Sequence, residues 1–374
     1  MGKFTNNLNN RIEATSSKYH RELFQTFLTA PEWKNVEMSE EFANFLKEGK
    51  SFHHFPYFKE IAEFWRVFNN SYQAARKYNG RLEIITSDYM FMNIFIGLFS
   101  SVEYITKGLF SLTLWPFLPK ENNTQFQQYV SGLFNDYASF IHKTPFYNYP
   151  YFSKIKPLAQ HFLNSDNKSL VDFVTFFSTL CELNTRGIIS LPVAGFYNQE
   201  VNQEDEKISL IVKKSVSTQA KPEEFKQEFL NLIKEIELLQ RNTSTESIEI
   251  VSQHEHEQTY ARQSTKKDKT YAYAHIRVPR YEAFYEVVKE LVANEIKIAK
   301  IAGQDRLQIK CTAHTKDPEA LAQTINTITI KTDCSYLYGY KGISFFDVPT
   351  KKIPLFLDTV ENTQGATVTF MHDF

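Results

Sequence analysis

The feature that most constrains the fold of this chain is a change in the spacing of its apolar residues at about residue 200. Before that point apolar residues recur at intervals of three and four, as in Phe42, Phe45 and Leu46, which is typical of one face of an α-helix. After it, short segments such as Tyr271–Val278 alternate with a period of two, which is typical of a β-strand. Most of the 33 phenylalanines and all 3 tryptophans also precede residue 200. The two halves therefore need different cores.

The change of pattern predicts an all-α, aromatic-rich helical bundle followed by an α+β half. The length of 374 residues is enough for two or three domains. We place the helical domain at residues 1–198, with about six to eight helices separated by proline and glycine breaks. The polar segment 199–206 is expected to be a linker.

The α+β half shows one order of strands and helices twice. Residues 207–304 follow the order βαββαβ, which is the order of a ferredoxin-like unit. Residues 305–374 follow it again, and an offset of 70 residues aligns Val278 with Val348. We predict two tandem ferredoxin-like units, and one larger α+β domain is the alternative.

The second of these units has the weaker pattern. A short helix is expected over residues 318–325, and the alternation from Thr327 to Lys331 predicts a strand directly after it.

Charge and cysteine content narrow the classes of partner. The 42 basic and 43 acidic side chains nearly balance, so no overall field would attract nucleic acid, and none is expected as a partner. The three cysteines, Cys181, Cys311 and Cys334, are odd in number and widely spaced, which favours a reducing compartment. The first residues lack the apolar core of a secretory signal, so a cytoplasmic location is expected. Cys181 lies on an apolar helix and is expected in the core.

The segment from Tyr89 to Leu118 carries only two charged side chains, Glu103 and Lys107. Two charges near the middle of a membrane span would cost about 2.5 to 3.5 kcal/mol each, so a full span is not expected. Either the segment is a helix buried in the bundle, with a break near Gly108, or it dips into one leaflet of a membrane as part of a peripheral protein. Glu103 and Lys107 are spaced to form an ion pair on one face.

An aromatic bundle with one ion pair is able to line a ligand pocket. We therefore expect ligand contacts from Asp88, Glu103, Lys107, Trp65 and Tyr104.

Two adjacent histidines, His53 and His54, are the candidate metal ligands of the first half. Neighbouring side chains on a helix point about 100° apart, so distant residues would have to complete such a site. Hydrogen-bonded or capping histidines are the alternative interpretation.

Three classes of function remain. The first is a non-catalytic binding or regulatory protein that holds an apolar small molecule or a membrane surface in its helical half, with an α+β half that senses a small molecule or mediates assembly. The second is a metal- or haem-dependent enzyme. Its site would lie either in the helical bundle, where Glu103, Lys107, Asp88 and His53 or His54 would converge, or on a ferredoxin-like sheet, with a haem held by His275, His314 or His372. The third is a structural or host-interaction protein. The sequence contains no motif of a nucleophilic hydrolase and no phosphate loop, and it indicates no cofactor. A homo-oligomer that pairs through its sheet edges is compatible with the predicted fold. The first class is favoured.

Overall fold

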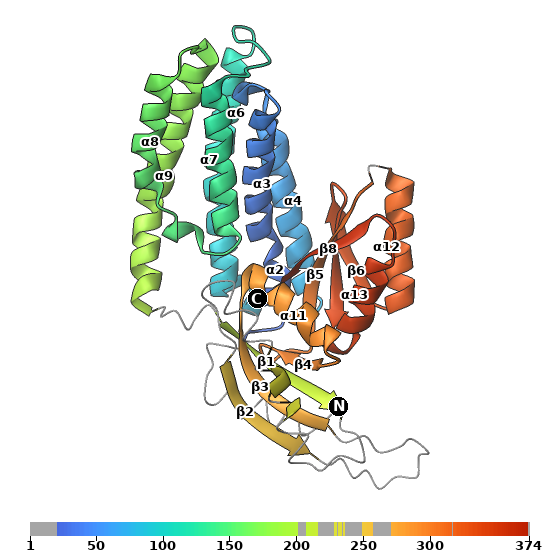
Figure 1. Ribbon diagram of the computed structural model, residues 1–374. Coiled ribbons are helices and arrows are strands. Elements are labelled where there is room, and N and C mark those ends of the chain that lie inside the picture. The colour runs from blue at the N-terminus through green and yellow to red at the C-terminus, as the bar shows by residue number, and fades with distance from the viewer. Residues whose placement is uncertain are drawn as a thin grey trace. The chain divides into compact units, whose positions relative to one another are not determined.

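The computed structural model describes most of the chain, in two compact units. The described residues are 21–200, 207–215, 228–229, 231–233, 235, 249–256, 271–315 and 317–372. One unit spans Leu28–Asn202 and is helical, and the other joins the residues before it to Gln203–Phe374 and is α+β (Figure 1). The predicted helical half and α+β half are both confirmed.

The helical unit is built from long helices linked by short turns. Its elements are α3 (Ala30–Lys47), η2 (Phe52–His54), α4 (Tyr57–Ala75), α5 (Arg81–Ile85), α6 (Asp88–Leu114), α7 (Gln125–Ile141), η3 (Phe146–Asn148), α8 (Tyr151–Asn164) and α9 (Leu170–Glu200). Helix α9 thus continues into the predicted linker 199–206, whose residues 201–206 lie outside the described part of the chain.

Side-chain caps fix where two of these helices begin. The Ser87 hydroxyl accepts a hydrogen bond from the Met90 amide at 3.2 Å at the start of α6. The Thr124 hydroxyl accepts one from the Gln127 amide at 3.1 Å at the start of α7. Both satisfy amides that have no partner within the first turn.

The helical unit contains one arrangement of helices twice. Helices α3, α4 and α6 correspond to α7, α8 and α9, and the short helices η2 and η3 occupy the same place in the two series. The residues at 41–46 read EFANFL and those at 136–141 read DYASFI. In both copies a tyrosine that begins a helix donates to the carbonyl at the start of the short helix, with Tyr57 to Phe52 and Tyr151 to Phe146 both at 3.0 Å.

The two copies also share a close helix contact. A Cβ atom on Gly108 of α6 would lie 2.7 Å from the ring of Phe58, and one on Gly187 of α9 would lie 2.8 Å from the ring of Phe152. Phe58 and Phe152 occupy the same place in α4 and α8, each following the helix's first tyrosine. Glycine at both positions lets the aromatic ring approach the helix this closely.

Helix α6 differs from one of the two predictions made for its segment, that of a broken helix buried in the bundle. It continues through Gly108 for 27 residues without a break, since this glycine serves a close contact and keeps helical geometry. It does not lie at the centre of the bundle, because Leu98, Val102 and Leu109 are 57%, 68% and 56% exposed. Within the described residues, none of the helices combines the length and the hydropathy required to cross a membrane.

The described residues of the α+β unit form two antiparallel sheets. The strands are β1 (Lys207–Ser215), β2 (Glu249–His256), β3 (Tyr271–Pro279), β4 (Lys297–Ile301), β5 (Arg306–Ala313), β6 (Ser335–Tyr340), β7 (Ile343–Pro349) and β8 (Ala366–His372). The helices are α11 (Tyr281–Ala293), α12 (Pro318–Thr332), η5 (Thr350–Lys352) and α13 (Ile353–Glu361). The strand orders are β2-β3-β1-β4 and β6-β7-β5-β8, with all neighbours antiparallel.

One hydrophobic core serves both sheets. It includes Ile276 of β3 and Ile309 of β5, both fully buried, together with Val287 of α11 and Phe356 of α13. The N-terminal residues also join this unit, because the Thr26 hydroxyl donates to the His372 carbonyl at 2.9 Å.

The strand predicted at Thr327–Lys331 is wrong, because these residues form the last turns of α12. Threonine hydroxyls bond back along the helix, as when Thr329 donates to the carbonyl of Ile325 at 2.7 Å, and Ile328 is buried. Asp333 ends the helix in the left-handed conformation with φ of 51°. The strand is instead β6, which follows this cap. Residues 222–240, whose apolar spacing predicts the first helix of the first unit, lie mostly outside the described residues.

Candidate functional site

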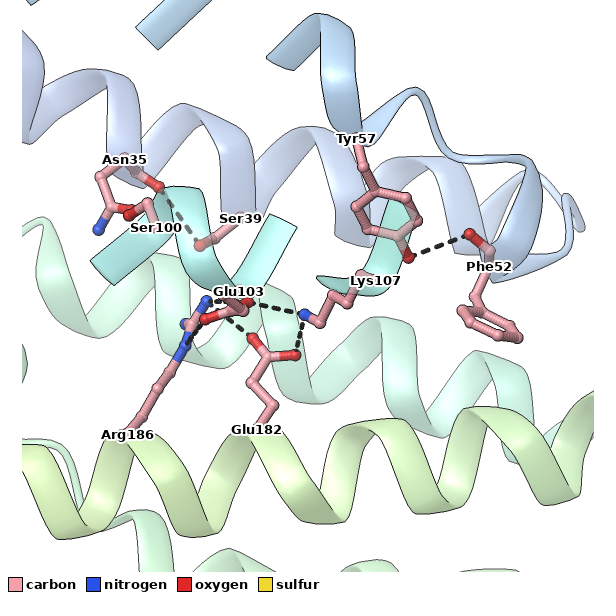
Figure 2. A network of polar contacts seen from close by, with 9 residues as sticks. All are labelled: Asn35, Ser39, Phe52, Tyr57, Ser100, Glu103, Lys107, Glu182 and Arg186. Atoms are coloured by element: carbon pink, nitrogen blue, oxygen red, sulfur yellow. Dashed lines mark hydrogen bonds and ion pairs between the residues drawn. The ribbon is translucent and has the colours of Figure 1, made fainter. Parts of the chain in front are cut away.

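Four charged side chains meet between α6 and α9 inside the helical unit. Glu103 and Lys107 come from α6, and Glu182 and Arg186 come from α9 (Figure 2). Their side chains are 2% to 12% exposed. We call these four residues the charged cluster.

Each acid of the charged cluster contacts both bases. Lys107 Nζ lies 2.7 Å from Glu103 Oε1 and also pairs with Glu182. Arg186 donates from Nε and Nη2 to the two oxygens of Glu103 at 3.1 and 3.0 Å. Its Nη2 also lies 2.7 Å from Glu182 Oε1, as an ion pair without hydrogen-bond geometry. Two acids and two bases balance, so the cluster buries no net charge.

The surroundings shift the ionisation of this cluster in opposite directions. Burial acts to raise the pKa of the Glu103 carboxyl, but the charges of Arg186 and Lys107 outweigh it and hold that pKa well below its usual range. Burial raises the pKa of the Glu182 carboxyl, and the nearby charge of Glu103 adds to this although Arg186 opposes it. Burial also raises the pKa of the neighbouring Tyr57 hydroxyl, which donates to the Phe52 carbonyl at 3.0 Å.

Glu103 and Lys107 were expected from the sequence as an ion pair, whereas Glu182 and Arg186 were not. The signal that identifies them is the internal repeat. In α6 the sequence runs Glu103, three residues, Lys107 and a glycine, and in α9 it runs Glu182, three residues, Arg186 and a glycine. A four-residue spacing places acid and base on one face of each helix. Because residue 103 pairs with 186 and residue 107 with 182, the two helices run antiparallel here.

A pocket of about 630 Å³ lies beside the charged cluster, between the same two helices. Its lining residues are Phe99, Val102, Glu103, Thr106, Lys107 and Phe110 of α6, and Phe173, Val174, Phe177, Ser178, Cys181, Glu182 and Thr185 of α9. The lining is mostly apolar, with three hydroxyl groups and one wall of mutually paired charges. This volume and composition are typical of a small-molecule site.

Three of the predicted ligand-binding residues lie away from this pocket. Asp88 begins α6 and is exposed, 15 residues before Glu103, which corresponds to about 22 Å along a helix. Trp65 donates from Nε1 to the Ser101 hydroxyl at 2.8 Å. Tyr104 is buried, and its ring lies 5.6 Å from that of Tyr57. Of the five predicted residues, only Glu103 and Lys107 line the pocket.

The two candidate metal ligands form part of η2. His53 is buried, and its ring centroid lies 4.5 Å from that of His54, which in turn lies 3.9 Å from Trp115. Burial lowers the pKa of both imidazoles, and the charge of His54 adds to this for His53, as that of Lys120 does for His54. Across the described ranges no group of three or more His, Cys, Asp or Glu side chains is placed to hold a metal ion.

The histidines considered for a haem are dispersed in the α+β unit. His275 is buried in β3, where its Nε2 contacts the Ser209 hydroxyl. His372 is buried between the rings of Phe345 and Phe370, and burial holds its pKa well below the usual range. His314 is exposed.

The prediction that Cys181 is a core residue is wrong, because Cys181 is exposed and lines the pocket. The outward face of α9 is apolar, so an apolar neighbourhood in the sequence did not imply burial. Cys311 and Cys334 are buried.

Comparison with known protein families found no matching family, and comparison with curated proteins found no matching protein. The pocket and the charged cluster are therefore the basis on which a function is inferred.

Proposed function

We propose that the helical unit is a non-catalytic binding module for an apolar small molecule, held between α6 and α9. The observation that carries the proposal is the pocket of about 630 Å³ with its mostly apolar lining. Apolar side chains such as Val102, Phe173 and Phe177 are exposed around it, at 68%, 43% and 59%. Covering such surface with an apolar ligand is favourable by about 25 cal/mol per Å².

The charged cluster restricts the charge of the ligand. Its two acids and two bases are paired with one another, so a charged ligand group would have no uncompensated partner there. The hydroxyls of Thr106, Ser178 and Thr185 remain able to orient a carbonyl or hydroxyl group. The expected ligand is therefore neutral and mostly apolar, with at most one or two polar groups.

For the α+β half we propose two tandem ferredoxin-like units that sense a small molecule or mediate assembly. Support comes from the strand orders β2-β3-β1-β4 and β6-β7-β5-β8, which are the same in the two sheets and follow from the βαββαβ pattern. The shared core of the sheets favours pairing of the two units within one chain.

The test begins with native mass spectrometry of freshly purified protein, followed by titration with N-phenyl-1-naphthylamine, a neutral fluorescent probe. A Thr106→Trp change should fill the pocket and weaken probe binding at least tenfold. Thr113→Trp is the matched control, since Thr113 is also an exposed threonine of α6 but does not line the pocket. The probe should also slow alkylation of Cys181, the exposed cysteine.

Each result bears on the proposal. A bound apolar mass, or probe binding lost in Thr106→Trp and kept in Thr113→Trp, supports it. If no apolar mass is bound and the two variants bind the probe like the unmodified protein, the pocket is not a ligand site. A stoichiometric metal or a haem spectrum would favour an enzyme instead.

A further inference from the structure

Helix α6 has its polarity reversed relative to a helix of a water-soluble bundle. Most of its buried residues are small or polar, namely Asn93, Gly97, Ser100, Gly108 and Ser111, and they alternate with the larger Met90, Ile96 and Tyr104. Its outward face carries large apolar residues, which are Phe91, Ile94, Leu98, Val102, Ile105, Leu109 and Leu112, exposed at 38% to 72%. A helix that packs in water normally does the opposite and turns its apolar stripe toward the core.

Helix α9 shows the same reversal at the equivalent positions. Thr175, Thr179 and Ser190 are buried, at 2%, 3% and 5%. The residues that correspond to Leu98, Leu109 and Leu112 of α6 are Phe177, Ile188 and Leu191, exposed at 59%, 61% and 60%. The reversal therefore belongs to the repeated unit and is not a local irregularity of one helix.

Charge follows the same inside-out rule. Between Tyr89 and Leu118 the charged residues are Glu103 and Lys107, and between Phe173 and Gln199 they are Glu182 and Arg186. All four are turned inward and pair with one another. From Tyr89 to Leu118 and from Phe173 to Gln199 the outward faces therefore present no charged side chain, and the exposed Asp88 lies at the very start of α6.

We propose that this surface, made by the outward faces of α6 and α9, docks on a lipid bilayer and contacts the acyl chains of one leaflet. Acyl chains solvate large apolar side chains, whereas small residues allow close contact between helices. Both helices show this distribution, with large apolar residues on the outward face and small residues on the inward face. A protein partner would normally meet a polar rim around an apolar centre. The exposed apolar residues of α6 instead recur from Phe91 to Leu112, which corresponds to about 32 Å along a helix. Trp115, 48% exposed at the end of α6, suits the membrane interface.

This proposal concerns the surface around the pocket and does not depend on whether the pocket holds a ligand. The rim residues Val102, Phe173 and Phe177 belong to both, so a docked protein would open its pocket toward the acyl chains.

The experiment is flotation of the full chain with vesicles of pure phosphatidylcholine at low and high salt. Because the docking faces carry no charge, we expect binding that needs no anionic lipid. Salt screens only interactions between charges, so the affinity for vesicles should change by less than about twofold between 0.05 and 0.5 M salt. A Leu109→Lys, Leu191→Lys double variant should raise the lipid concentration for half binding at least tenfold. Neither residue lines the pocket. Ile330→Lys, at a 79% exposed apolar position of α12, is the matched control.

Flotation that is lost in the double variant and kept in Ile330→Lys supports docking on lipid. A full chain that stays with the soluble fraction at every lipid concentration refutes it. The proposal is also wrong if the chain forms a stable dimer that the double variant converts to monomers without any vesicle binding, since a second copy would then cover the face. Because the probe titration is carried out without vesicles, failure of docking remains distinct from failure of ligand binding.

Discussion

Replacing Arg186 by methionine is the most direct test of the charged cluster. The change leaves two carboxylates, Glu103 and Glu182, with Lys107 as the single base, in a place where the side chains are 2% to 12% exposed. Removing one partner of a buried ion pair costs about 3 to 5 kcal/mol, because an uncompensated charge stays behind. We therefore expect the free energy of unfolding of the helical unit to fall by about that amount.

Tryptophan fluorescence during urea denaturation measures this loss in the helical unit alone. All 3 tryptophans of the chain, Trp33, Trp65 and Trp115, lie within Leu28–Asn202. Lys154→Met is the control, since Lys154 pairs with Asp136 at 2.7 Å with side chains 29% and 52% exposed, and such a pair contributes about 0.2 to 1 kcal/mol.

The loss should also depend on pH, with a definite sign. In the unmodified protein the lowered pKa of Glu103 gives stability that is present above its unfolded pKa of about 4.3 and is lost as the pH falls. In Arg186→Met the surplus carboxylate should have a raised pKa, so acid would neutralise it. The difference between the two proteins should therefore shrink between pH 7 and pH 4.5.

Adding Glu182→Gln to Arg186→Met restores the charge balance and should recover much of the lost stability. The reasoning is refuted if Arg186→Met costs no more than Lys154→Met, or if its cost is the same at pH 4.5 as at pH 7.

Two further predictions concern packing and titration. Gly187→Val should lower the free energy of unfolding by about 1 to 3 kcal/mol, seen as a lower urea midpoint, because its Cβ would lie 2.8 Å from the ring of Phe152. Gly132→Ala, with open space around the new Cβ, should be neutral or slightly stabilising. Equal effects of the two changes would contradict the close contact. Burial holds the pKa of His372 well below its usual range, so the α+β unit should lose stability as the pH falls below about 6.5. The imidazole NMR signals of His372 should stay constant from pH 7.5 to 5.5. A normal titration of these signals would refute the lowered pKa.

Much of the fold could be predicted from the sequence, because hydrophobic period reports directly on secondary structure. The alternating segment Tyr271–Val278 falls within β3, and the order βαββαβ is the order of elements from β5 to β8. Where one period imitates another the prediction failed, as at Thr327–Lys331, whose alternating threonine and isoleucine continue a helix. The threonine hydroxyls there donate to backbone carbonyls one turn earlier, as Thr327 does to Gln323 and Thr329 to Ile325, and no spacing rule shows these hydrogen bonds.

The site was only half predictable, for a different reason. Glu103 and Lys107 stood out because the segment around them has no other charge, whereas Glu182 and Arg186 were found only through their partners in space. The outward exposure of α6 and α9 was also missed, since helical period tells which residues share a face and does not tell which face is turned toward the core. Comparing the two helices residue by residue would have related Glu182 to Glu103 and Arg186 to Lys107.

The repeat also affects how a ligand would be oriented. The two helices that line the pocket share the sequence pattern Glu, Thr, base, Gly. Other equivalent positions of the repeat differ, since Phe99 in α6 corresponds to Ser178 in α9 and Val102 corresponds to Cys181. Each wall has two phenylalanines, but they stand at different positions of the repeat, with Phe99 and Phe110 on α6 and Phe173 and Phe177 on α9. A pocket formed from two identical copies would accept a molecule equally well in either direction, but this one distinguishes the two ends of its ligand, which a single chain carrying both copies can evolve and a dimer of identical chains cannot.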